Sequence, residues 1–245
     1  MYLLRTCGPL SLLRDGAPVD SIHTHRNALA VLVVLATDGP ATRDRLMALL
    51  WPDSDAARAR GSLKQVLHFL RRHLEPLPLV AGPLQLALDE RVVTSDLRLI
   101  RDAMAAGDPA SVVALYHAPF LDGVHLGGSV QLEHWISRRR AELADAYRSA
   151  LELLAIQAGE RGLWPEAVGW WRRLQAEDPL DGHAALELMR ALAAAGQSVA
   201  AIRHGRSHEL LVREELGLAP DLAVSTLVER LRRQAASGSG AASIA

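Results

Sequence analysis

The chain has 245 residues and a formal net charge of -1, from 27 Lys and Arg against 28 Asp and Glu, and Cys7 is its only cysteine. These numbers exclude an intramolecular disulfide framework, a cysteine-rich zinc site and a protein that is basic over its whole surface. Hydrophobic residues make up 49% of the chain and aromatic residues only 4%, which favours helices with cores of Leu, Ala and Val. The sequence has neither an apolar run of ~20 residues nor a signal-peptide pattern, so we expect a cytoplasmic protein without a membrane partner.

The first part of the chain predicts short strands followed by two helices. Residues 1–20 alternate apolar runs with Gly-Pro and Asp-Gly turn signals, a pattern typical of antiparallel strands. Residues 26–39 predict a buried helix, because they are mostly apolar up to an Asp-Gly-Pro stop. Residues 42–51 predict a second helix, for which Thr42 is a suitable N-cap.

A third helix and a hairpin complete the predicted N-terminal domain. The helix begins after Asp53-Ser54-Asp55 and ends near Leu74, since two prolines follow closely and prevent its continuation. Residues 77–93 predict two short apolar strands that turn around Gly82. Strands, three helices and a closing hairpin are the order of a winged helix-turn-helix, so residues 1–93 predict an α+β domain of that kind.

The remainder of the chain has a helical pattern that repeats after 34 residues, which is the tetratricopeptide period. The shift pairs Leu154 with Leu188, Gly162 with Gly196, Ala167 with Ala201 and Arg172 with Arg206. We expect Trp171 to fill the gap between repeat helices, whereas its neighbour Trp170 is equally suited to line a ligand groove.

The predicted fold is therefore mainly α: a winged helix-turn-helix (α+β) followed by an all-α tetratricopeptide-like helical repeat domain. The repeat domain is expected over residues 94–233, with Thr94-Ser95-Asp96 as a helix start, and is expected to mediate protein contacts. Residues 234–245 lack apolar periodicity and are expected to form a disordered tail.

Residues 58–74 form a local basic stretch that contains no carboxylate. Its cations are Arg58, Arg60, Lys64, Arg71 and Arg72. On a 3.6-residue wheel one apolar stripe is made by Ala59, Leu63, Val66, Leu67, Leu70 and Leu74. The opposite face suits a DNA major groove, because Arg can bind guanine, Gln65 can bind adenine, and Lys or Ser can bind phosphates. Charge alone favours a solvated surface helix, but the position behind a helix and a turn is that of a recognition helix.

Four stretches of the sequence carry a resemblance to a known family. They are "LRTCGPLSLLRDGAPV", "LLWPDSD" before the basic helix, "LYHAPFLDG" with Trp135 and Arg139 downstream, and "EELGLAPD". Over about residues 2–233 the chain resembles the antibiotic-regulatory-protein type of bacterial transcriptional activator. That family joins an OmpR-type winged helix to a tetratricopeptide-like bacterial transcriptional activator domain.

The resemblance implies a function and a set of site residues. It implies sequence-specific binding to double-stranded promoter DNA, often on direct repeats where a homodimer can form, and recruitment of RNA polymerase. It places Ser62, Gln65, Phe69 and Arg72 where the recognition helix meets bases or backbone. It also places the hairpin around Gly82 where a wing meets the adjacent minor groove.

Other signals in the sequence are weak. No nucleophile elbow, paired-carboxylate motif or dinucleotide fingerprint occurs, so we expect neither an enzyme nor a cofactor. His204 and His208 have a spacing that suits one metal ion, but no third ligand follows, and we expect both on a helix surface without a metal. The basic run at residues 138–140 is expected to pair with nearby acids.

Two alternative functions stay open at this point. The chain could be a protein-interaction adaptor whose winged helix does not bind DNA, or a sensor of a small molecule. Retention on random duplex DNA separates the adaptor from the DNA-binding regulator, because phosphate contacts carry non-specific binding.

Overall fold

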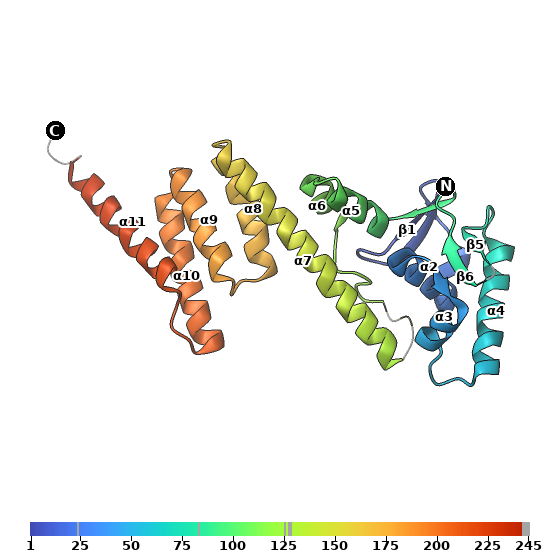
Figure 1. Cartoon of the computed structure of the whole chain (residues 1–245). Helices are drawn as coiled ribbons and strands as arrows, with labels where there is room; N and C mark the ends of the chain where they lie inside the picture. Colours follow the sequence, from blue (N-terminus) through green and yellow to red (C-terminus); the bar gives the residue numbers. More distant parts are fainter. Residues whose placement is uncertain (24, 83, 125, 127–128, 242–245) are drawn as a thin grey trace. The chain divides into compact units, whose positions relative to one another are not determined.

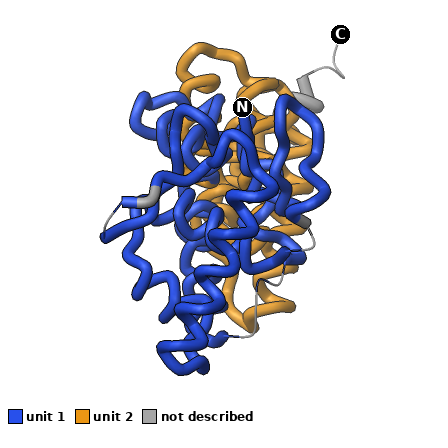
Figure 2. The backbone as a smooth tube through the Cα atoms, turned by 90° about the vertical axis from the view of Figure 1, so that its right-hand side faces the viewer, with its two compact units in different colours: residues 1–147 blue, residues 148–245 orange. Residues whose placement is uncertain are grey.

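The structure is a computed structural model of the whole chain, and it describes all residues except 24, 83, 125, 127–128 and 242–245 (Figure 1). The chain divides into two compact units, residues 1–147 and residues 148–245, which Figure 2 shows in separate colours. The strands are β1 (Tyr2–Arg5), β2 (Ser11–Arg14), β3 (Ala17–Pro18), β4 (Ala41–Thr42), β5 (Leu79–Ala81), β6 (Gln85–Leu88) and β7 (Val93–Ser95).

Helices make up most of the chain, as the sequence predicts. They are α1 (Asp20–His23), α2 (Arg26–Asp38), α3 (Arg43–Leu50), α4 (Ala56–His73), α5 (Asp96–Ala105), α6 (Pro109–Leu115), α7 (Val130–Glu160), α8 (Trp164–Glu177), α9 (Gly182–Ala194), α10 (Ser198–Leu216) and α11 (Leu222–Ala241). Among the described residues, no helix combines the length and the hydropathy that a bilayer crossing requires.

The first sheet has the strand order β3-β2-β1-β7. Strands β1 and β2 are antiparallel, with Tyr2 opposite Arg14, as the turn signals predict. Strand β7 runs parallel to β1, with Tyr2 opposite Val93. The sequence instead predicts that the hairpin ends at Val93 and that Thr94-Ser95-Asp96 begins a helix. The parallel pairing joins segments about ninety residues apart, so no local turn signal announces it.

Helices α2, α3 and α4 and the second sheet form the predicted winged helix-turn-helix. Helix α2 is the centre of the core, since every residue from Ala28 to Ala36 is buried. Thr42 caps α3 by accepting a hydrogen bond from the Arg45 backbone N–H at 3.1 Å. The strand order β4-β6-β5 gives the closing hairpin, in which β5 and β6 are antiparallel.

Helices α5 and α6 and the start of α7 belong to the same compact unit as the winged helix. The buried Asp96 carboxylate accepts hydrogen bonds from the backbone N–H of Thr6 at 2.6 Å and of Cys7 at 2.7 Å. It also accepts from the Thr6 hydroxyl at 2.7 Å, so α5 is fixed to the end of β1. The division between the units after residue 147 therefore differs from the domain boundary expected after residue 93.

The basic run at residues 138–140 acts within this unit. Arg139 pairs with Asp38 at 2.8 Å and with Glu142 at 2.5 Å, as expected for this run, whereas the exposed Arg138 forms no ion pair within the described residues. Arg140 behaves differently, because its guanidinium donates to the carbonyls of Phe120 and Leu121, each at 2.6 Å.

In the second unit the helices α8 to α11 stack one after another (Figure 1). Ala167 and Ala201 are buried at equivalent positions of α8 and α10, and Trp171 is buried as predicted. His208 is also buried, and its Nδ1 donates to the Pro179 carbonyl at 3.1 Å, so the expectation that it lies on the helix surface is wrong.

The C-terminal helix α11 extends beyond the predicted limit of the repeat domain. It runs to Ala241, so residues 234–241, expected in a disordered tail, are helical. Gln234, Ala235 and Ala236 favour this continuation, because Ala and Gln have high helix propensity. The last residues of the expected tail, 242–245, lie outside the described residues.

Candidate nucleic-acid interface

Helix α4 is amphipathic, and its apolar stripe is buried as the wheel predicts. The Asp55 side chain begins the helix by accepting a hydrogen bond from the Arg58 backbone N–H at 2.9 Å. The stripe consists of the buried residues Ala59, Leu63, Val66, Leu70 and Leu74, with Leu67 half-buried beside them. Burial of one face against the domain leaves the other face of α4 available to a partner.

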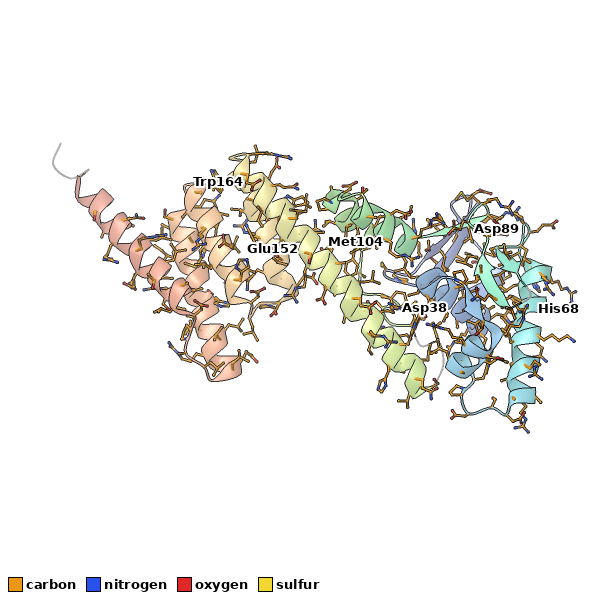
Figure 3. The ribbon with its side chains drawn as sticks, in the orientation of Figure 1. Asp38, His68, Asp89, Met104, Glu152 and Trp164 are labelled. Carbon is orange, nitrogen blue, oxygen red and sulfur yellow. The ribbon has the colours of Figure 1, made fainter. Side chains whose placement is uncertain are left out.

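All five predicted cations of α4 are exposed. Arg58 lies 3.5 Å from the Asp55 carboxylate and is therefore paired within its own helix start. Within the described part of the chain, the other four form no ion pair or hydrogen bond through their side chains: Arg60, Lys64, Arg71 and Arg72. His68, on the same helix, is also exposed (Figure 3). The helix thus presents unneutralised positive charge to solvent.

Three of the predicted site residues face a cleft beside this basic surface. Ser62, Gln65 and Phe69 line it from α4, together with Val66. The start of α2 and one later residue line the opposite side: His25, Arg26, Asn27, Ala28 and Leu126. The cleft has a volume of about 580 Å³. The predicted cations therefore lie on the exposed surface, while Ser62 and Phe69 line the cleft and Gln65 does both.

Phe69 is held between two imidazole rings. The ring of His25 lies 3.7 Å from it, and the ring of His73 stacks on it at 4.2 Å, both measured between centroids. His73 is itself positioned by a contact of 3.0 Å between its Nδ1 and the Phe69 carbonyl. These two close ring contacts fix the orientation of the Phe69 side chain. Phe69 therefore helps to hold the C-terminal end of α4 in position beside the cleft.

Sequence reasoning missed the residues that α2 and α3 bring to this surface. His25, Arg26 and Asn27 are exposed at the start of α2, yet only the fold shows that they face α4 across the cleft. Arg43 donates to the Gly82 carbonyl in the hairpin loop at 3.3 Å, which supplies a cation next to a wing that has none at its tip. The only sequence signal was the basic character of "HRN" and of Arg43 itself, which does not reveal these contacts.

The described residues give this surface positive charge and hydrogen-bond donors. Among them, no group of three His, Cys, Asp or Glu side chains is placed to hold a metal ion. The side chains on and beside the exposed face of α4 carry guanidinium, ammonium, amide and hydroxyl groups, which are chemically able to donate hydrogen bonds to phosphates and base edges.

The comparisons with known proteins agree with this architecture. The solved structure of Mycobacterium tuberculosis EmbR in complex with low affinity phosphopeptide is similar in fold, with a TM-score of 0.67 and 22% identity over 95% of this chain. The present chain spans 65% of that EmbR chain. No curated protein sequence matches the present chain.

One protein-family model matches most of the chain from the end of the hairpin onward. The model described as bacterial transcriptional activator domain matches residues 88–232. This range starts close to the boundary that the sequence predicts and includes α5 to α10 and part of α11. Because the match covers more than half of the 245 residues, the chain belongs to the bacterial transcriptional activator domain family.

Proposed function

We propose that this chain is a cytoplasmic transcription regulator that binds double-stranded promoter DNA in a sequence-specific manner through α4. The observation that carries the proposal is the group of four unpaired cations on the exposed face of a helix whose other face is buried. A negatively charged backbone would neutralise these cations and release counterions on binding. We propose no catalytic activity and no cofactor.

The residues of α4 divide into two proposed kinds of contact. Gln65 and Arg72 project from the centre of the polar face, so we assign them to base edges. Lys64 and Arg71 lie on its flank and are assigned to phosphates, as are the cations Arg58 and Arg60 at the helix start. Ser62 completes the phosphate contacts from the cleft side, and Phe69 keeps the helix end in position.

The remaining parts of the proposed function concern partners. We propose that the chain is an activator that recruits RNA polymerase through its helical-repeat region, and that it binds promoter repeats as a homodimer. The family description supports activation. The stacked helices of the second unit support a protein-contact role, because helical repeats offer extended surfaces to partners.

Binding to random duplex DNA separates this function from that of an adaptor. The double variant Lys64→Ala/Arg71→Ala should bind a random duplex more weakly than the unmodified chain in a fluorescence anisotropy titration at low salt. The control is Arg206→Ala/Arg213→Ala, which removes the same charge from exposed positions of α10 and should leave affinity unchanged. An unmodified chain that passes over immobilised duplex DNA without retention would favour the adaptor.

A further inference from the structure

A second polar pocket lies in the second unit, the region proposed to contact partner proteins. It has a volume of about 430 Å³. Helices α8, α9 and α10 form its wall through Arg172, Gln175, Ala176, Leu188, Leu192, Ala200, Arg203, His204 and Ser207. All of these residues belong to residues 148–245, so the pocket is complete within one unit.

Buried polar atoms at this pocket have unmet hydrogen-bonding capacity. Gln175 is only 8% exposed, and its amide Nε2 donates to the carbonyl of Pro179 at 2.8 Å and to that of Asp178 at 3.4 Å. Two carbonyl acceptors at one amide atom identify that atom as the nitrogen, so the Oε1 atom is an acceptor. In the described structure Oε1 is buried without a donor, and His204 Nε2 is buried without a partner. Such groups are rare in folded proteins, and a bound molecule that supplies the missing partner is one way to satisfy them.

The rim of the pocket is cationic. Arg172 and Arg203 are exposed, and within the described part of the chain neither side chain forms an ion pair or a hydrogen bond. The pocket wall contains no carboxylate that could neutralise them. Because these guanidinium groups have no existing partner, turning them toward an anion would cost no hydrogen bond within the protein.

We infer that this pocket binds an acidic segment of a partner protein, with a side-chain carboxylate between Arg172 and Arg203 and, after a shift of the side chains that cover it, a backbone N–H donated to Gln175 Oε1. Guanidinium groups form their strongest hydrogen bonds with carboxylates. A peptide offers both required groups within one residue, whereas chloride or sulfate has no donor for Oε1. The apolar side chains Leu188 and Leu192 would contact the methylenes of the acidic residue.

The inference rests on the protein-contact part of the proposed function, for which it names a site. It does not depend on DNA binding, since no residue of α4 takes part. The chain should therefore bind an acidic peptide whether or not DNA is present.

The experiment measures binding of a fluorescein-labelled tetraglutamate peptide to the full chain by anisotropy, with a tetraglutamine peptide as the uncharged match. Arg172→Ala and Arg203→Ala should each weaken tetraglutamate binding by about tenfold, because each removes a charge-assisted hydrogen bond. The control Arg206→Ala removes a guanidinium that is exposed on the same helix as Arg203 but does not line the pocket, and should change nothing. Equal losses for all three variants, or equal binding of both peptides, would overturn the proposed site.

Two changes to the ligand test the rest of the inference without altering the protein fold. A tetraglutamate peptide with N-methylated backbone amides keeps its carboxylates but loses its donors, so it should bind about tenfold more weakly. Sodium glutarate should displace the labelled peptide only at far higher concentration than unlabelled tetraglutamate does. Unchanged binding of the methylated peptide, or displacement at equal concentrations, would mean that the pocket takes any carboxylate and not a peptide.

The two proposals fail in different ways. Loss of peptide binding in the Arg172 and Arg203 variants, with DNA binding unchanged, supports this site whatever the fate of the α4 proposal. If the double variant Lys64→Ala/Arg71→Ala no longer binds the peptide, the peptide binds on α4, and the proposed site formed by α8, α9 and α10 is refuted.

Discussion

The carboxylate of Asp38, which is labelled at the end of α2 in Figure 3, accepts a hydrogen bond at 3.2 Å. Its donor is the indole Nε1 of Trp135 in α7. Arg139, one helical turn further along α7, pairs with the same carboxylate at 2.8 Å, and Arg45 of α3 also pairs with it. The Asp38 side chain is only 4% exposed. One buried carboxylate therefore joins the winged helix to α7 within the first unit, and it gives Trp135 and Arg139 a structural role.

Replacing Asp38 by Asn should lower the stability of the first unit. The Asn side chain has the same size but cannot neutralise Arg139 and Arg45, so we expect a loss of about 1–3 kcal/mol. The measurement is the free energy of unfolding from urea denaturation. Asp145→Asn is the matched control, because Asp145 is exposed on α7 and should change stability by less than about 0.5 kcal/mol. Equal effects of the two variants would contradict the assigned role of Asp38.

Gly205 stands 34 residues after Trp171, at the equivalent position of the second repeat, and helix packing requires a glycine there. A Cβ atom at this position would lie 2.6 Å from Val228 and 2.7 Å from Met189, so α10 can approach α9 and α11 only with glycine there. Gly205→Ala should destabilise the second unit by roughly 1–3 kcal/mol. Gly169→Ala, in α8, meets no atom within 4 Å and should instead stabilise the chain by roughly 0.5–1 kcal/mol. Thermal unfolding of both variants by circular dichroism gives the comparison.

The thiol of Cys7 should be unreactive in the folded chain. Burial, together with the nearby Asp96 carboxylate, raises the pKa of the Cys7 thiol to about 12. Since the thiolate is the reactive form, an aromatic disulfide reagent at about pH 8 should modify the native chain very slowly. In guanidinium chloride one thiol per chain should react at once. Rapid modification under native conditions would show that β1 is not closed over this residue.

The second unit should become less stable in mild acid. Burial, the neighbouring His208 and Arg172 lower the pKa of His204 below its ordinary value of 6.5. Below pH 6.5 the imidazole of His204 therefore binds a proton more readily in the unfolded chain than in the folded chain. The contribution of neutral His204 to the free energy of unfolding is complete above pH 6.5 and is lost as the pH falls below that value. His204→Asn should reduce the decline in unfolding free energy between neutral pH and about pH 5. An unchanged decline would assign it to other groups.

The parts of the fold that could be predicted depend on local chemistry. Thr42 caps α3 as expected, and Asp55 caps α4 where the sequence predicts a helix start, because a cap needs only a short side chain and the next turn of backbone. The buried stripe of α4 follows from helical periodicity, and Trp171 is buried because the repeat has a fixed period. These features involve residues close together in the chain.

The parts that could not be predicted depend on contacts between distant segments. The parallel pairing of β7 with β1 and the contact of His25 with Phe69 have no local signal. His208 looks like a surface residue from its spacing, but the Pro179 carbonyl gives it a buried partner. The cations and the amide of α4 could be named from the sequence, whereas the cleft next to them required the fold.

A salt titration of four alanine variants tests whether α4 contacts DNA in two distinct ways. Gln65→Ala and Arg72→Ala are compared with Lys64→Ala and Arg71→Ala, on a duplex selected from random DNA and on its scrambled counterpart. Arg206→Ala is the control for the loss of a remote cation, and circular dichroism checks the folding of each variant.

The base-contacting and phosphate-contacting variants should differ in kind. Gln65→Ala and Arg72→Ala should cost roughly 1–3 kcal/mol on the selected duplex and much less on the scrambled one. Lys64→Ala and Arg71→Ala should weaken both complexes alike and reduce the slope of log affinity against log salt by about one unit. Equal losses for all four variants on both duplexes, or losses no larger than that of Arg206→Ala, would contradict the proposed roles of α4.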